Sequence, residues 1–386
     1  MPQFLDQNLC DDFRKAINDS PIFYKDEKLK RFYDLFCAVM DRLDSSISYL
    51  NEHSKMPKSE TEFVVFVMFG CMAIDTIKKI HRTLGLSYKY KNPDDLEKHR
   101  YFGTICKNSP LNLSDDECPT DDLFFEYFRS LVFAHPVDTD RAPFLKSKGE
   151  KHYSPWVIVN NMAFFAYGIK DGVGVRIYSN LYDDGYNIKD LYFSFSVLKD
   201  YIKSRYELIE QATGWVRSQI ANSETLWKQR KVDRSLTPIE TLRDVANVLK
   251  SRYVDCYDID EAIICLTCES SVAENNVAAM SFRNAIIEIV PSICDAVDSL
   301  DNETWADLLD NVLYARPKKM HAGANYQLEK IFTDRSNWRL IQADEFSKEF
   351  SKNHVTINPY AMSDDEIKML VRTACYLEMK AQGERS

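Results

Sequence analysis

The stretch LFFEYFRSLVFAHP, residues 123–136, decides how the first half of the chain folds. Its apolar residues fall on every side of a helix, so the sequence predicts a helix that is buried within its domain or at an interface. Thr120 supplies an N-cap, and Pro136 ends the helix because the residue before a proline is disfavoured in helical conformation. Two residues of this stretch, Arg129 and His135, do not suit an apolar helix.

A guanidinium keeps its charge in any protein environment, so a buried Arg129 requires an anionic partner or a wet cleft. His135 stands at the helix end, where free carbonyl groups and the helix dipole favour a protonated imidazole. An arginine and a histidine that meet at a partly dry site can hold a phosphate and exchange a proton with it. The stretch is therefore a candidate phosphate-binding site.

The residues before and after this stretch predict further helices and a small sheet. Apolar residues have helical spacing over residues 28–50 and 198–228. A third helix is predicted over residues 59–84, because Ser-Glu-Thr-Glu62 has the capping-box pattern. Three segments instead alternate apolar and polar residues, which predicts an antiparallel β-meander at about 153–197; they are residues 153–160, 173–180 and 191–197.

The sequence predicts a domain boundary at residues 235–238, where a basic run ends and Thr-Pro-Ile-Glu240 opens a new helix. The predicted fold is mainly α: a helical bundle with an inserted β-meander in residues 1–235, then a second, all-α domain in residues 236–386. The helices expected in the second domain are 238–251, 259–268, 272–290, 293–299, 304–314, 325–332 and 364–380.

Composition restricts the setting of the chain. The 386 residues carry ten cysteines without a secretory pattern, which predicts reduced thiols and a cytoplasmic protein. The longest apolar stretch, residues 63–74, is too short to span a bilayer, so no membrane contact is expected. Residues 236–386 hold 25 acidic and 16 basic residues, a net charge of −9 out of −10 for the chain. Any contact with a polyanion is therefore expected in the first domain, and the acidic second domain is expected to be regulatory or partner-binding.

The segment Arg129-Ser130-Leu-Val-Phe-Ala-His135 resembles the R-x4–6-H signature of the HEPN superfamily, with a polar residue directly after the arginine. The resemblance covers about a dozen residues closely and the helices of residues 28–230 more loosely, and the β-meander departs from a plain bundle. It implies a helical bundle with the motif at a helix end. Many such domains are metal-independent endoribonucleases that act as homodimers, often as toxins or antiviral defence effectors.

The resemblance implies a role for each motif residue. Arg129 would bind the scissile phosphate of RNA, and His135 would act as general acid or base while the ribose 2′-hydroxyl attacks. Ser130 would complete the catalytic set. The product would carry a 2′,3′-cyclic phosphate, and neither a metal nor a cofactor would be needed; a DNA substrate is not expected.

An alternative interpretation gives the same residues structural roles. Arg129 would pair with Glu126 or another carboxylate of the core, and His135 would only end the helix. The chain would then be a non-catalytic helical interaction or regulatory protein that keeps the bundle.

Two basic segments are weaker candidates for RNA contacts. Lys78, Lys79 and Arg82, with His81, Lys89 and Lys91 and the aromatic Tyr88 and Tyr90, can track an RNA backbone or form a solvated helix end. Arg316 and His321 repeat the motif spacing, but a proline follows the arginine. With Lys318 and Lys319 they predict an exposed basic loop or a phosphate-contacting patch, less readily a second catalytic motif. The pair Cys265 and Cys268 lacks further ligands and predicts buried thiols rather than a zinc site.

Overall fold

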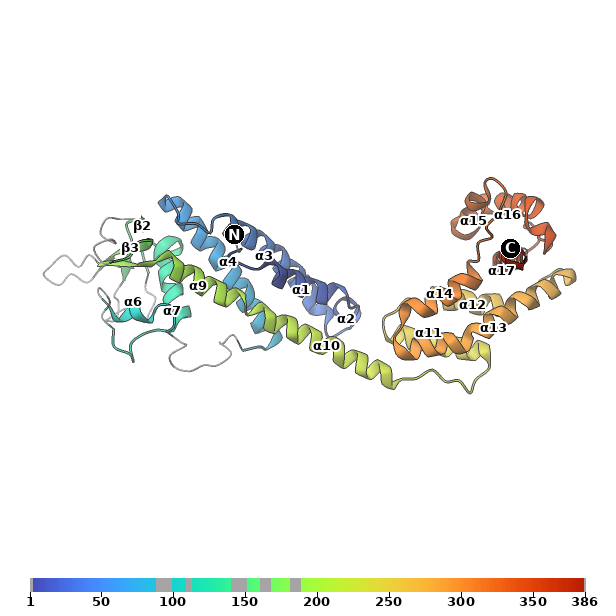
Figure 1. Cartoon of the computed structure of the whole chain (residues 1–386), viewed down its shortest axis with the longest axis horizontal. Coiled ribbons are helices and arrows are strands. Elements are labelled where there is room, and N and C mark those ends of the chain that lie inside the picture. Colours follow the sequence, from blue (N-terminus) through green and yellow to red (C-terminus); the bar gives the residue numbers. More distant parts are fainter. Residues whose placement is uncertain are drawn as a thin grey trace. The chain divides into compact units, whose positions relative to one another are not determined.

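The computed structural model describes residues 3–87, 99–108, 111, 113–139, 151–159, 168–180 and 189–384. Over these residues the chain is mainly helical, with a small antiparallel sheet of four strands, as the sequence predicts (Figure 1). The chain forms two compact units, Met1–Ile220 and Ala221–Ser386.

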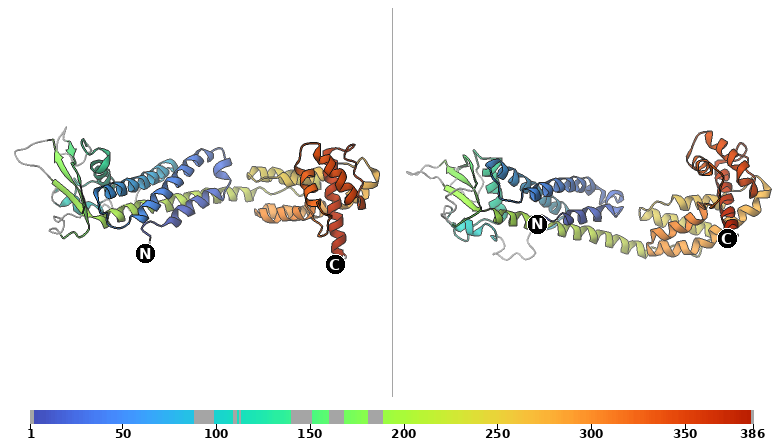
Figure 2. Two further views of the ribbon diagram at one scale, coloured as in Figure 1. Left: turned by 90° about the horizontal axis from the view of Figure 1, so that it is seen from above. Right: turned by 45° about the horizontal axis from the view of Figure 1, so that its top comes forward.

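The first unit is a helical bundle with the sheet at one end and α2 at the other (Figures 1 and 2). Its helices are α1 (Gln7–Asn18), α2 (Ile22–Lys25), α3 (Tyr33–Glu52), α4 (Glu60–Leu84), α6 (Gly103–Lys107), α7 (Asp121–Arg129), α9 (Phe195–Tyr206) and α10 (Ile209–Gln229), the last of which runs on into the second unit. Helices α3 and α4 confirm two predicted helices, whereas α1 was not predicted.

The helix predicted over residues 198–228 is divided into α9 and α10. The break falls at Leu208, whose carbonyl oxygen lies 2.9 Å from Nε2 of the buried His81 in α4. A side chain from another helix therefore satisfies the carbonyl at the break, which offsets the cost of interrupting the helix.

Helix α4 begins and ends where its sequence signals stand. The Ser59 hydroxyl accepts a hydrogen bond from the Glu62 amide, and Gly85 adopts the left-handed conformation, with φ of 67°, that ends the helix. The Glu62 carboxylate accepts from the amide of Lys58 at 2.8 Å, so only the serine half of the predicted capping box forms.

The sheet consists of β1 (His152–Tyr153), β2 (Val157–Val159), β3 (Gly172–Ser179) and β4 (Lys189–Ser194). Strand β3 pairs antiparallel with β2 and β4, which is the predicted meander, and its end also pairs with β1. One face of the sheet packs on α7, where the rings of Phe193 and Phe128 lie 4.9 Å apart. The last strand ends at Ser194, because the Ser194 hydroxyl caps α9.

The second unit contains helices and, over residues 221–384, no β-strand. After the end of α10 its α-helices are α11 (Pro238–Ser251), α12 (Tyr257–Thr267), α13 (Asn276–Ser299), α14 (Asn302–Leu313), α15 (Ala324–Thr333), α16 (Trp338–Glu349) and α17 (Asp364–Glu384). Residues before the predicted boundary also pack here: Val232 lies in this core, and Arg252 donates to the carbonyl of Trp227 at 2.9 Å.

Helix α13 differs from the two helices predicted over residues 272–290 and 293–299, because it continues through Pro291. The proline is exposed, while Val290 and Ile293 beside it are buried. The buried face is thus continuous across the proline, and its packing outweighs the lost backbone hydrogen bond.

The continuous segment Ala273–Ser299 is long and apolar enough to cross a membrane by length and composition. Core helices of soluble proteins meet the same criterion. Phe282, Ile286 and Val297 of α13 lie in the hydrophobic core of the second unit. The absence of membrane contact stays a prediction from the sequence.

A buried ion pair ties α17 to α12. Arg372 Nη1 lies 2.6 Å from Glu261 Oε2, and the Arg372 side chain is only 3% exposed. Its guanidinium carbon lies 5.2 Å from the ring centroid of Tyr314 and 4.9 Å from that of Phe332. A charged group at this depth requires such partners, and the pair is therefore a structural element of the second unit.

Candidate functional site

The candidate site is built on α4 and α7. The Thr120 hydroxyl accepts from the Leu123 amide and starts α7, as predicted. Phe124, Phe125 and Phe128 of α7 are buried, whereas Leu123 is 45% exposed, so the helix has one outward side. On this side Glu126 and Arg129 are partly exposed.

Arg129 finds its anionic partner on α4. Arg129 Nη1 lies 3.1 Å from Asp75 Oδ2, and the two side chains are 24% and 54% exposed. Burial alone would lower the pKa of Arg129, but the combined effects of Asp75, Cys71 and Glu126 outweigh it, and the pKa is raised. The guanidinium is thus charged, half-buried and held by a carboxylate that itself faces solvent.

The buried thiol of Cys71 lies one turn before Asp75 on α4. Burial raises the pKa of Cys71 to about 12, although the nearby charge of Arg129 acts in the opposite direction. The thiol therefore stays protonated near neutral pH and is no nucleophile there.

A second ion pair runs parallel to the first. Lys78 Nζ lies 3.4 Å from Glu126 Oε1, three residues along each helix from Asp75 and Arg129. The residue numbers increase along α4 from Asp75 to Lys78 while those of their partners on α7 decrease from Arg129 to Glu126. The two helices therefore run antiparallel where they cross. Glu126, which the alternative interpretation offered as the partner of Arg129, binds Lys78 instead.

The last turn of the motif helix is a π-helix, Ser130–Ala134. The His135 amide donates to the Ser130 carbonyl at 2.7 Å, which closes the wide turn just before Pro136. Single π turns within α-helices are often found at functional sites. The His135 side chain is exposed. Ser130 is buried, and its hydroxyl shares a hydrogen bond of 2.8 Å with that of Thr139.

Two residues without any recognisable sequence signal, Tyr127 and His152, fix the segment after the motif. The hydroxyl of Tyr127 and Nδ1 of His152 share a buried hydrogen bond of 2.6 Å. The backbone of His152 also pairs with that of Thr139, at 2.8 and 3.0 Å. Strand β1 therefore connects α7 with the chain that follows His135. The contact joins residues far apart in the sequence, and no local pattern predicts it.

The basic cluster predicted on α4 is only partly described. Lys79 and Arg82 are exposed at the end of α4, while Lys78 contacts Glu126 and His81 is buried against Leu208. Four members of the cluster lie outside the described residues: Tyr88, Lys89, Tyr90 and Lys91.

The second arginine–histidine pair lies in the other unit. Arg316, Lys318 and Lys319 are exposed in the loop between α14 and α15, as predicted. His321 is half-buried, with Nε2 2.7 Å from Gln327 Oε1 and its ring 5.9 Å from that of Phe346. This histidine is thus engaged in packing within the second unit.

The cysteine pair does not belong to a larger group of ligands. Cys265 is buried with its sulfur 3.5 Å from Arg372 Nη1, and Cys268 is half-buried. Over the described parts of the chain, no group of three or more His, Cys, Asp or Glu residues could hold a metal ion.

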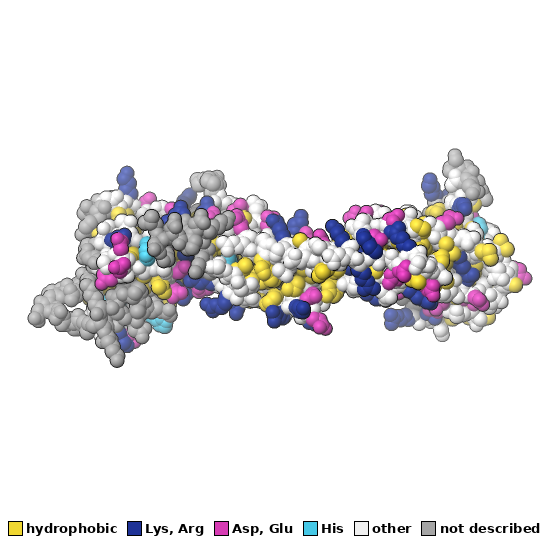
Figure 3. All heavy atoms as spheres, turned by 90° about the horizontal axis from the view of Figure 1, so that it is seen from below, with side chains coloured by type: hydrophobic (Ala, Val, Ile, Leu, Met, Phe, Trp, Pro, Cys, Tyr) yellow, Lys and Arg dark blue, Asp and Glu magenta, His cyan; other side chains and the backbone are white. Residues whose placement is uncertain are grey.

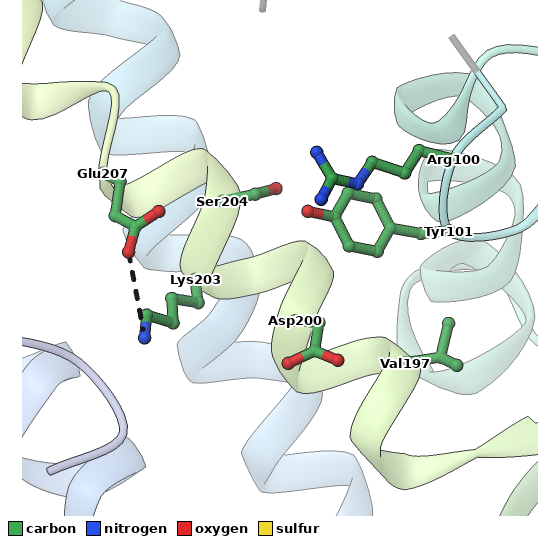
Figure 4. Close-up of a pocket in the computed structure, with 7 residues that line it drawn as sticks. All are labelled: Arg100, Tyr101, Val197, Asp200, Lys203, Ser204 and Glu207. Atoms are coloured by element: carbon green, nitrogen blue, oxygen red, sulfur yellow. Dashed lines mark ion pairs between the residues drawn. The ribbon is translucent and has the colours of Figure 1, made fainter. Parts of the chain in front are cut away.

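A cavity of about 490 Å³ is lined by residues outside the motif (Figure 4). Its lining residues carry both signs of charge, and Lys203 and Glu207, one turn apart at the end of α9, form an ion pair of 3.9 Å. The lining consists of Arg100, Tyr101, Val197, Asp200, Lys203, Ser204 and Glu207. The balanced charge does not favour an anion, so the exposed motif is the stronger candidate for phosphate chemistry.

Charge on the viewed surface is mixed. In Figure 3, Lys and Arg side chains are interspersed with Asp and Glu side chains over the described residues. Binding of a polyanion would accordingly depend on local contacts rather than on a broad basic face. Comparisons of the chain with protein-family models, with curated proteins and with solved structures gave no match.

Proposed function

We propose that this protein is a metal-independent endoribonuclease of HEPN type, with Arg129 and His135 as its catalytic residues. The observation that carries the proposal is the placement of these two residues. Arg129 is the last residue of α7, and its side chain is partly exposed. The π turn of residues 130–134 follows, and His135 comes directly after it with an exposed side chain. The residues resemble the R-x4–6-H motif, and both side chains reach solvent.

Arg129 would bind the scissile phosphate after leaving Asp75. An ion pair this exposed stabilises a protein by about 0–1 kcal/mol, so an incoming phosphate can displace the carboxylate at low cost. The guanidinium can donate two hydrogen bonds to the phosphate oxygens and stabilise the charge that develops there.

His135 would transfer the proton. The ribose 2′-oxygen attacks phosphorus as its proton leaves, the bond to the 5′-oxygen breaks, and that oxygen is protonated. The products are a 2′,3′-cyclic phosphate and a 5′-hydroxyl. Ser130, which the resemblance places in the catalytic set, is buried against Thr139 and in this proposal positions the π turn.

The wider context follows from the resemblance. The active form would be a homodimer that brings two motifs together in the cytoplasm, and the acidic second unit would bind a protein partner or regulate cleavage. A toxin or an antiviral defence effector is the corresponding role.

The test is cleavage of total RNA in EDTA by the purified chain, compared with Arg129→Ala and His135→Ala. Loss of the general acid–base residue should slow cleavage by roughly 10²- to 10⁴-fold. Matched controls are Arg217→Ala and His53→Ala, which change exposed residues elsewhere in the chain. Intact RNA with wild-type protein under every condition, or equal cleavage by the motif variants, contradicts the proposal.

A second candidate is a non-catalytic helical interaction protein. The specific observation in its favour is that Asp75 already supplies the anion that Arg129 needs. Stable binding of a protein partner by the wild type and by both motif variants, with no RNA turnover, would support this candidate.

A further inference from the structure

The outer face of the sheet carries aromatic side chains next to the motif. The buried residues of β3 alternate with Arg176 and Tyr178, which therefore lie on the opposite face. The register places Tyr153 of β1 opposite Tyr178. Trp156 precedes β2, and its carbonyl accepts a hydrogen bond of 3.3 Å from the Arg176 amide.

Trp156 is a large aromatic residue that remains 45% exposed. The guanidinium carbon of Arg176 lies 5.2 Å from the centroid of its ring. Asp190 on β4 holds this guanidinium through two hydrogen bonds, of 2.6 and 2.8 Å. The guanidinium of Arg176 is thus held in place against the indole of Trp156, and the carboxylate of Asp190 neutralises the charge of Arg176.

A backbone hydrogen bond links the chain that carries Trp156 to the candidate site. The Ser154 amide donates to the Pro136 carbonyl at 2.6 Å, so the chain before Trp156 is bonded to the residue that follows His135. From this bond and the reach of the backbone, the Cα atoms of His135 and Trp156 are at most about 18 Å apart. A few nucleotides of a single strand span this distance.

We propose that Trp156 is a stacking platform for a base of single-stranded RNA that flanks the cleaved phosphate. The inference rests on the proposed function and adds a binding subsite to it. Every base has a π-face, so stacking on an indole tolerates any sequence, whereas the bases of a duplex are already stacked and paired. Because Asp190 neutralises Arg176, this subsite contributes base stacking and not phosphate neutralisation.

The experiment measures binding of a labelled single-stranded oligoribonucleotide to the full-length His135→Ala protein in EDTA, by fluorescence anisotropy. Adding Trp156→Ala should raise Kd about tenfold, the effect expected for loss of one stacked base, and Trp156→Phe should keep most of the affinity. The matched control is Trp338→Ala, which removes a tryptophan of similar exposure, 44%, from the second unit.

Salt dependence separates stacking from charge. The slope of log Kd against log salt should be the same with Trp156→Ala as without it, whereas Arg129→Ala should make the slope shallower. A thermal unfolding curve of Trp156→Phe that matches the parent excludes a folding defect in that variant.

Two results would overturn the inference. One is equal affinity of Trp156→Ala and Trp338→Ala for the single strand, and the other is a changed salt slope with Trp156→Ala. Either result combined with normal wild-type cleavage leaves the proposed function intact. Absence of cleavage by the wild type overturns the proposed function, and tight single-strand binding that depends on Trp156 would still support the subsite.

Discussion

Asp75 on α4 and Arg129 on α7 form an ion pair of 3.1 Å that leaves the carboxylate more exposed than the guanidinium. The motif arginine is therefore masked by a residue that an incoming phosphate must displace. Within the proposed function, Asp75 is a competitor of the substrate.

Asp75→Asn should raise kcat/KM for RNA cleavage by up to about fivefold, the equivalent of about 1 kcal/mol, because the phosphate no longer competes with a carboxylate. The matched control is Asp12→Asn, which removes the carboxylate of an exposed pair with Arg217 and should leave cleavage unchanged. If Asp75→Asn instead cleaves as poorly as Arg129→Ala, Asp75 positions the arginine and does not compete.

Tyr127→Phe should destabilise the first unit by about 1–3 kcal/mol, because Nδ1 of the buried His152 loses its hydroxyl partner. Thermal unfolding followed by circular dichroism should show the first unit melting several degrees lower. Tyr24→Phe, at a 46% exposed position, should melt as the parent does. An unchanged melting temperature for Tyr127→Phe would show that this bond does not stabilise the segment after the motif.

Glu261→Gln should destabilise the second unit by about 3–5 kcal/mol, because Arg372 keeps its charge and loses its buried carboxylate. Urea unfolding monitored in both units should show that the second unit of this variant unfolds at a lower urea concentration than the second unit of the wild type. Asp344→Asn, which removes an exposed pair with Lys348, should have little effect. Retained RNA cleavage by Glu261→Gln would separate the folding of the second unit from catalysis in the first.

Cys71 should resist alkylation by iodoacetamide in the native protein at pH 8 and react only after unfolding in urea. Burial raises the pKa of its thiol to about 12, so the protonated, unreactive form persists throughout the neutral range. Peptide mass spectrometry identifies the labelled cysteines, with the half-buried Cys37 as an internal comparison. Rapid native labelling of Cys71, with loss of cleavage, would indicate a thiolate at the site.

Local signals predicted much of the fold. The cap at Ser59, the left-handed Gly85 and the capping box at Thr237 each satisfy backbone groups within a few residues, so their effects can be read from the sequence. Pro291 was misleading, because its effect on the helix depends on the packing of Val290 and Ile293 against other helices. Where the local signal of the proline and the burial of its neighbours disagree, tertiary packing determines whether the helix continues.

The candidate site was predictable only in part. The type and spacing of Arg129 and His135 identified the segment, and the need of Arg129 for an anion was anticipated. The identity of that anion was not, because Asp75 is 54 residues away in the sequence. The same holds for Trp156, whose relation to the motif depends on backbone hydrogen bonds such as that between Ser154 and Pro136.

The π turn at Ser130–Ala134 also changes what the spacing of the motif means. A wide turn takes up one residue more than an α-helical turn and returns the chain to the same neighbours. The five residues between Arg129 and His135 form one wide turn, where an α-helical turn would need only four residues. The extra residue need not change the positions of Arg129 and His135. The spacing from Arg129 to His135 therefore does not by itself fix how the two side chains lie relative to each other, because it depends on the winding of the backbone between them.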